Sequence, residues 1–215
     1  MDNSQRGLEF LQAGDADGLR RILEQDPLVS EARDPAGVSL LMNSLYRGRL
    51  DLAGLIASKK KTLDIFEATS LGRLDLLKAY LSDTSALNSC SADGFTALHF
   101  ACFFGQPEAA RLLIESGASV NAVAANSMQV MPLHSAASNR NLKAARLLLE
   151  HGAIANARQH GGWTPIHAAA QNGDRPMVEI LLEHGADPTL ANDDGKTPAT
   201  VATEKGHKEI AALLA

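Results

Sequence analysis

The chain has few residues of several kinds, and each shortage excludes a class of protein. Cys90 and Cys102 are the only two cysteines among 215 residues, too few for a disulfide framework, so a reduced pair is expected. The 20 basic residues are outnumbered by 25 acidic ones, which disfavours the broad positive surface that nucleic-acid binding requires. No apolar run approaches the roughly 18 residues of a membrane-spanning helix. We therefore expect neither nucleic acid nor a membrane as a partner.

The first residues, MDNSQRGLEF, contain neither the basic nor the apolar segment of an export signal. This absence predicts a cytoplasmic protein. The composition, with 45% hydrophobic and 21% charged residues, is that of a chain that can bury a sizeable core.

The chain contains an internal repeat. The segments GFTALHFACFFGQ, VMPLHSAASNRN and GWTPIHAAAQNGD share one pattern. Alignment on His99, His134 and His167, followed by Thr200, gives steps of 35, 33 and 33 residues. A fixed period of this size predicts stacked supersecondary units in one elongated arrangement.

Earlier copies are weaker, and they place Leu8, Met42 and Phe66 in the position of the histidine. The step from Met42 to Phe66 is only 24 residues, so the long connection found elsewhere is missing. We predict two helix pairs joined there by a tight turn at SKKKT, with the lysine run exposed to solvent. We also expect this junction to be the weakest in the stack, because the stability of repeat proteins is a sum over neighbouring contacts.

In the best-preserved unit, the spacing of the apolar residues and the residues typical of helix ends predict two helices. Thr164 can cap the first helix, Pro165 suits the first helical position, and Gly173 can end it with a positive φ. The second helix is predicted over 176–184, with an apolar stripe that needs a partner on each side. Polar, turn-rich segments follow each pair and predict extended hairpin-like loops.

The pattern G-x-T-P-L-H-x-A-A-x-x-G, followed by an apolar helix that ends in L-L-x-x-G-A, resembles the ankyrin repeat. This resemblance covers essentially the whole chain. It implies an all-α fold: an ankyrin-repeat α-solenoid of about seven helix-turn-helix units with hairpin-like loops between the later repeats. It implies a single domain over 1–215, with approximate repeats at 4–26, 38–58, 62–82, 95–116, 130–151, 163–184 and 196–215.

In proteins of this kind, partners meet a groove lined by the hairpin tips and by two residues near the end of each inner helix. Tyr46 and Arg47 occupy such a pair early in the chain. The residues that the resemblance makes candidates for partner binding are Phe95, Phe103, Phe104, Met128, Val130, Ser138, Asn139, His160, Trp163, Gln171 and Asn172.

Aromatic residues make up 4% of the chain, yet Phe95, Phe103 and Phe104 fall in the groove positions of one repeat. If these side chains face solvent, they form an apolar patch of the kind that marks a binding site. The alternative is that Phe103 or Phe104 packs beneath the neighbouring hairpin as part of the core.

Other motifs that suggest chemistry are incomplete. His99, His134 and His167 occupy the structural position of the repeat, and no histidine has close ligand spacing with a second histidine or cysteine. DADG at 15–18 lacks the later ligands of a calcium loop, and GKT at 195–197 lacks the first glycine of a phosphate loop. We therefore predict no catalytic residue, no metal and no cofactor.

The expected function is a non-enzymatic, monomeric protein–protein interaction module that binds another protein or a peptide on its concave groove. One alternative is a small-molecule or enzymatic site beside His160 and Trp163, which would need titratable groups that converge in a pocket. Another is a structural spacer or scaffold, which a buried pair of Phe103 and Phe104 would favour.

Overall fold

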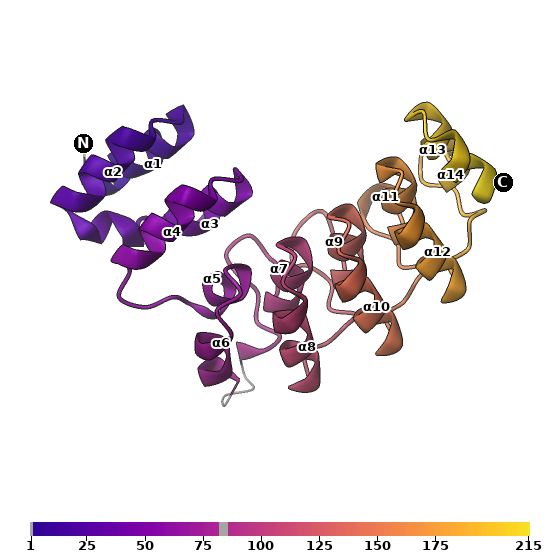
Figure 1. The fold of residues 1–215 in the computed structure, drawn as a ribbon, viewed down its shortest axis with the longest axis horizontal. Coiled ribbons are helices and arrows are strands. Elements are labelled where there is room, and N and C mark those ends of the chain that lie inside the picture. Colours follow the sequence, from indigo (N-terminus) through magenta and orange to yellow (C-terminus); the bar gives the residue numbers. More distant parts are fainter. Residues whose placement is uncertain (1, 82–85) are drawn as a thin grey trace.

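Seven helix pairs follow one another along a curved stack, with the two termini at opposite ends (Figure 1). The computed structural model describes residues 2–81 and 86–215, and within them the regular elements are all helices. The α-helices are α1 (Asn3–Ala13), α2 (Ala16–Gln25), α3 (Leu40–Tyr46), α4 (Leu50–Lys59), α5 (Ile65–Ser70), α6 (Leu74–Tyr80), α7 (Ala97–Phe103), α8 (Pro107–Glu115), α9 (Pro132–Ser138), α10 (Leu142–Glu150), α11 (Pro165–Asn172), α12 (Arg175–Glu183), α13 (Pro198–Glu204) and α14 (Lys208–Leu213). The 3-10 helices η1 (Pro27–Glu31) and η3 (His160–Gly162) lie in the connections. This is the predicted all-α solenoid. The predicted end of the third repeat, residue 82, lies outside the described residues.

Odd-numbered helices form one layer, here called the inner helices, and even-numbered helices form the outer layer (Figure 1). Each inner helix packs against its own outer helix and against the inner helices before and after it. None of the helices in the described part of the chain is both long and apolar enough to cross a bilayer.

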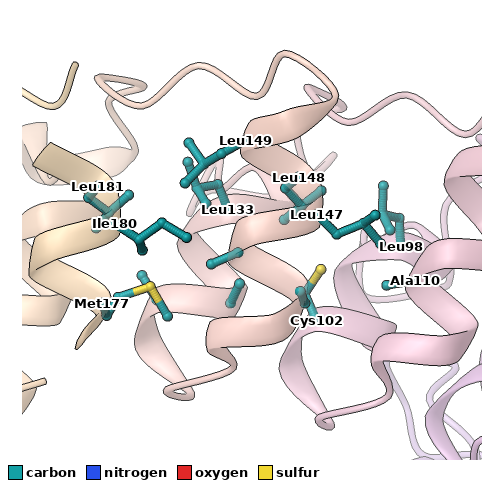
Figure 2. Close-up of a cluster of buried hydrophobic side chains, with 14 of the residues drawn as sticks. Leu98, Cys102, Ala110, Leu133, Leu147, Leu148, Leu149, Met177, Ile180 and Leu181 are labelled. Atoms are coloured by element: carbon teal, nitrogen blue, oxygen red, sulfur yellow. The ribbon is translucent and has the colours of Figure 1, made fainter. Parts of the chain in front are cut away.

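The core lies between the two layers and consists of one apolar set repeated along the stack. Leu98 and Leu133 of the inner helices and Leu148 and Leu181 of the outer helices belong to this set, and all four are buried (Figure 2). Fully buried alanines such as Ala136 line the inner helices, where a small side chain lets neighbouring helices approach closely. Truncating one of the leucines to alanine would cost about 2–5 kcal/mol.

The helix boundaries follow the predicted signals. Thr164 is the N-cap of α11, Pro165 is its first residue, and the helix ends at Gly173, whose φ is 65°. This positive φ favours glycine, because a side chain would be strained there. The second helix of this unit starts at Arg175, one residue before its predicted start.

The connections between most repeats are hairpin-like loops, here called fingers: residues 34–38, 91–95, 124–130, 159–163 and 192–196. A hydrogen bond from the backbone N–H of the first residue to the carbonyl oxygen of the last closes each finger, at N···O distances of 2.8 or 2.9 Å. Successive later fingers are also joined, as by the N–H of Ala125 to the carbonyl of Gly94 at 2.7 Å. Finger 34–38 shows that such loops are not confined to the later repeats.

The junction between α4 and α5 has no finger, which confirms the predicted tight connection, since α4 ends at Lys59 and α5 begins at Ile65. As a result finger 34–38 lies directly beside finger 91–95: a Cβ added at Gly37 would be 3.1 Å from the Cβ of Ala92. The buried apolar residues divide into two clusters near this junction, and Phe66 of α5 packs against both.

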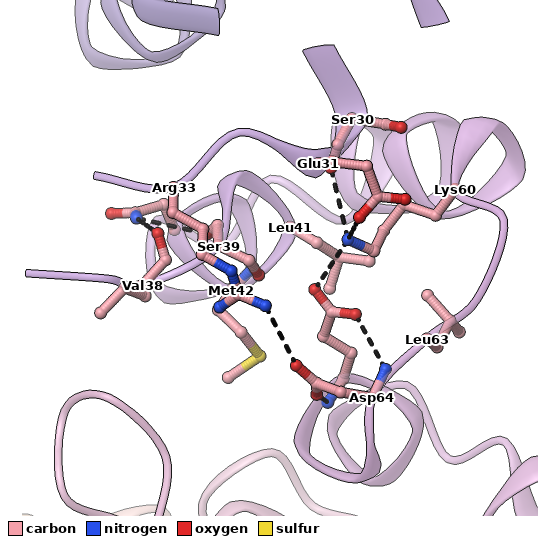
Figure 3. Close-up of polar contacts among 12 residues, drawn as sticks. Ser30, Glu31, Arg33, Val38, Ser39, Leu41, Met42, Lys60, Leu63 and Asp64 are labelled. Atoms are coloured by element: carbon pink, nitrogen blue, oxygen red, sulfur yellow. Dashed lines mark hydrogen bonds and ion pairs between the residues drawn. The ribbon is translucent and has the colours of Figure 1, made fainter. Parts of the chain in front are cut away.

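The lysine run at this junction is not uniformly solvated, so that prediction was wrong for Lys60. The Lys60 side chain is only 2% exposed, and its Nζ lies 2.7 Å from a carboxylate oxygen of Glu31 and 3.4 Å from one of Glu67 (Figure 3). Glu67 is itself 1% exposed and accepts a hydrogen bond from the backbone N–H of Asp64. A buried carboxylate needs a compensating charge, and Lys60 supplies it.

Candidate interaction surface

Six aromatic rings gather where α3, α5, α7 and finger 91–95 meet. They are Tyr46, Phe66, Phe95, Phe100, Phe103 and Phe104. The ring centroids of Phe103 and Phe104 are 5.0 Å apart in an edge-to-face arrangement, and those of Tyr46 and Phe104 are 5.8 Å apart. Such pairs contribute about 0.5–1.5 kcal/mol each beyond the burial of their area. The cluster is therefore stabilised by contacts among its own rings.

Local helix geometry positions the phenylalanines of α7. Phe100 and Phe104 are four residues apart, so both lie on the side of α7 that faces the preceding repeats, where Phe100 is buried. Phe103 is the last residue of α7 and keeps 41% of its surface exposed. The end of the helix thus holds one ring in the core and presents another to solvent.

Tyr46 reaches this cluster from two repeats away. It is the last residue of α3, and its hydroxyl donates a hydrogen bond to the carboxylate of Asp93 in finger 91–95. Partial burial, together with the hydrogen bond and charge of Asp93, raises the pKa of Tyr46 above its ordinary value. A contact between the second and fourth repeats is possible because no finger stands between them.

A cavity of about 220 Å³ opens among these rings on the side of the fingers and inner helices. We call it the aromatic cup. Tyr46, Phe103 and Met128 at the cup are 40%, 41% and 51% exposed. The lining residues are Tyr46, Phe95, His99, Phe100, Phe103, Met128 and Ser135. Three large apolar side chains that remain this exposed in one place are unusual for a surface without a partner.

The structure divides the predicted apolar contacts into three groups. Phe103 and Met128 are exposed at the cup, and Phe95 lines it while half-buried. Phe104 is half-buried between Tyr46 and Phe100. Its ring therefore packs partly against other side chains of the protein, as the alternative for this residue predicts. Val130 does not belong on the surface: it is 6% exposed, and its carbonyl accepts a hydrogen bond from His99 of the preceding inner helix.

The predicted polar contacts lie further along the stack and outside the cup. Ser138, Asn139 and Gln171 are exposed at the ends of α9 and α11, but the side-chain amide of Asn172 donates to the carbonyls of Ala137 and Ser138. Asn172 therefore ties two repeats together, and its N–H groups are not free for a partner.

Trp163 and His160 lie in finger 159–163. The Trp163 ring is half-buried, with its centroid 5.5 Å from that of His167, whereas His160 is exposed. The structure brings neither residue to the aromatic cup. The cup instead includes Tyr46, whose groove position in the sequence is the signal that could have found it.

The histidines of the repeats use both ring nitrogens: Nδ1 bonds to the N-cap residue of the same helix, and Nε2 bonds to a carbonyl oxygen further along the chain. In His99, Nδ1 accepts the backbone N–H of Thr96 at 3.3 Å, and Nε2 donates to the carbonyl of Val130 in the next repeat at 3.0 Å. His134 and His167 make the corresponding bonds to Ala157 and Lys196. Burial lowers the pKa of His99 and of His134 to about 4. The neutral ring is thus the structural form.

Two further observations bear on whether the protein could catalyse a reaction. The Cys102 thiol is buried, which raises its pKa and makes it a poor nucleophile. Over residues 2–81 and 86–215, no three His, Cys, Asp or Glu side chains are arranged to hold a metal ion.

Comparison with known families agrees with this architecture. The family described as ankyrin repeats (3 copies) matches residues 65–159 and 153–215, which is more than half of the chain. The chain belongs to the ankyrin repeat family. Ankyrin repeats generally act as protein–protein interaction modules, and the family is generally non-enzymatic. The match begins at Ile65, the first residue of α5, so α1 to α4 lie outside it.

Similar curated proteins match over part of the chain. Zinc finger CCCH domain-containing protein 24 of Oryza sativa subsp. japonica is 34% identical over 128 residues, which are 55% of this chain and 14% of that protein. Ankyrin repeat domain-containing protein oryK of Aspergillus oryzae is 43% identical over 56 residues, which are 26% of this chain and 9% of that protein. The chain thus spans a small part of the length of both relatives.

Proposed function

We propose that this chain is a non-enzymatic module that binds another protein through its concave groove, with the aromatic cup as the main anchor site. The observation that carries this proposal is the exposure of Tyr46, Phe103 and Met128 around one cavity. Aromatic anchors in a pocket are the usual hot spots of protein interfaces. The exposed Ser138, Asn139 and Gln171 extend the same groove and would meet the rim of a partner.

The size of the cup favours a protein side chain over a free small molecule. Pockets for drug-sized ligands usually measure about 300–1,000 Å³, whereas the cup has about 220 Å³. The excess of acidic over basic residues, 25 against 20, favours a protein over a nucleic acid. We further propose that the chain acts as a monomer in this role.

Affinity capture with matched variants tests the proposal. The variant Phe103→Asp/Met128→Asp places two charges in the cup at positions exposed by 41% and 51%. The control Val123→Asp/Ile154→Asp places two charges at positions exposed by 48% and 50% elsewhere. Both variants should keep the circular dichroism spectrum and melting temperature of the parent, because exposed positions tolerate charge.

The parent and the control are expected to capture the same protein from a lysate of the source cells, and the cup variant is expected to lose it. Purified partner should then bind the cup variant at least about tenfold more weakly than the parent, as for an interface hot spot. Equal capture by all three proteins would contradict the cup as the anchor site.

A further inference from the structure

The finger edge of the groove carries unpaired negative charge. Arg33 is paired with Asp64 and Arg158 with Asp193. Asp34 and Asp93 of the fingers have no ion pair within the described part of the chain, and their carboxylates accept hydrogen bonds from neutral groups. Asp194 differs, because its charge acts on Lys196 of the same finger. Asp93 stands at the aromatic cup through its bond to Tyr46. This edge would therefore attract cationic side chains.

The opposite edge of the groove carries unpaired positive charge. Each finger leads into the first turn of an inner helix, so the last turns of these helices lie on the far side of the groove. Arg47 follows α3, Arg140 follows α9 and Lys205 follows α13, and none of them has an ion pair among the residues described. Glu204, which is close to Lys205 in sequence, is paired with Lys196. The groove thus changes sign across its width.

The backbone of the later fingers is already engaged. Gly94, Met128 and Gly161 accept hydrogen bonds through their carbonyls from the N–H groups of Ala125, His160 and Asp193, each in the next finger. An extended peptide gains its affinity from free backbone donors and acceptors at a sheet edge, and these fingers offer few. An α-helix needs none, because its own backbone is internally bonded.

We propose that the groove binds an amphipathic helix of a partner protein, with one large apolar side chain of the helix in the aromatic cup, basic residues along the edge that faces the fingers and acidic residues along the other edge. This proposal rests on the proposed function, since it specifies the partner of the same groove. A cavity of about 220 Å³ lined by Tyr46, Phe103 and Met128 suits one leucine, methionine or phenylalanine side chain.

Selection from an unbiased peptide library tests this proposal. A phage-displayed library of random peptides, each about 20 residues long and so long enough for a helix of about 30 Å, is panned against the full chain, with Phe103→Asp/Met128→Asp as the counter-selection. Enriched peptides are then synthesised and measured by fluorescence polarisation and circular dichroism. We expect apolar residues at i, i+3 or i+4 and i+7, with Lys or Arg on one flank and Asp or Glu on the other.

Charge variants then test the orientation. Asp93→Asn keeps an acceptor for Tyr46 but removes the charge, and it should weaken binding of an enriched peptide about two- to fivefold, as for an exposed ion pair. A peptide with its acidic and basic residues exchanged should bind the parent more weakly and regain affinity for the variant Asp93→Lys/Arg47→Glu. Ile154→Asp serves as the control and should change nothing.

The outcomes separate this inference from the proposed function. Enriched peptides could bind the parent and not the cup variant, yet be extended, rich in proline or without a preferred arrangement of charged residues. That result would overturn the helix proposal and leave the groove as the binding site. Peptides that bind the parent and the cup variant equally would overturn both. Failure to enrich any peptide on the parent above the cup variant would also count against both.

Discussion

At the scale of single residues, the buried histidines couple the stability of the stack to pH. His99 and His134 are 1% and 2% exposed, and each uses Nδ1 as an acceptor for a backbone N–H. Protonation would place a hydrogen on Nδ1, pointing at the backbone N–H that now donates to it. Burial accordingly holds the folded-state pKa of both near 4, below the ordinary value of 6.5.

The sign of the effect follows from these values. Between pH 6.5 and 4 the unfolded chain binds more protons than the folded chain, so the free energy of unfolding falls as pH is lowered through this range. The expected loss is about 3 kcal/mol for each histidine, complete only below pH 4. Urea unfolding at several pH values would measure it. The variant His99→Gln/His134→Gln should flatten this dependence of the free energy of unfolding on pH. An unchanged slope in this variant would contradict the assignment.

At the scale of elements, Lys60 links the end of α4 to η1 and α5 (Figure 3). The variant Lys60→Ala would leave the carboxylate of Glu67 buried without a counter-charge. We expect the free energy of unfolding to fall by about 3–5 kcal/mol. Lys59→Ala and Lys61→Ala, which change the neighbouring residues of the same run, should stay within about 0.5 kcal/mol. Urea denaturation of the three variants gives the comparison.

A double variant distinguishes the charge from the packing of Lys60. Lys60→Met/Glu67→Gln removes both buried charges and keeps side chains of similar size, so it should recover much of the stability lost in Lys60→Ala. If the double variant is no more stable than Lys60→Ala, the role of Lys60 at this junction is not electrostatic.

Glu31 also makes the stability of this junction depend on pH in the acidic range. Partial burial raises the pKa of Glu31, but the hydrogen bond and charge of Lys60, the backbone of Lys61 and the charge of Arg33 together lower it below its ordinary value. Its stabilising contribution is present above the unfolded-state pKa and is lost as pH falls through the folded-state value. Because Glu31 is 45% exposed, solvent screens this contribution.

At the scale of the whole molecule, the two clusters of buried apolar residues predict two units of local unfolding. One cluster extends from Leu8 to Phe100 and the other from Ile65 to Leu214, with Phe66 in contact with both. Hydrogen exchange followed by mass spectrometry should show α1 to α4 opening as a unit that is separate from α7 to α12. Lys60→Ala should speed exchange in the first unit far more than in the second. Uniform protection of the backbone amides from hydrogen exchange across residues 60–64 would contradict a weak junction between α4 and α5.

Much of the fold could be predicted from the sequence because the signals are local. A cap such as Thr164, a proline at the next position and a glycine with positive φ at 173 act within one or two helical turns. The period of about 33 residues repeats these signals along the chain. The groove positions of Phe103 and Met128 follow from the same register, as does the exposure that the structure gives them.

Only the tertiary structure decided how the shortened junction changes its surroundings. The missing finger lets Tyr46 at the end of α3 reach the rings of α7 and complete the aromatic cup. Lys60 turns inward to the buried Glu67, although it belongs to a run of lysines that the sequence predicts to be solvated. Val130 is likewise buried, and its carbonyl is bonded to His99. Tyr46 and Asp93 are 47 positions apart, and no periodicity of the sequence encodes their contact. Sequence alone determined the repeated unit, whereas the packing of unequal units against one another determined the site.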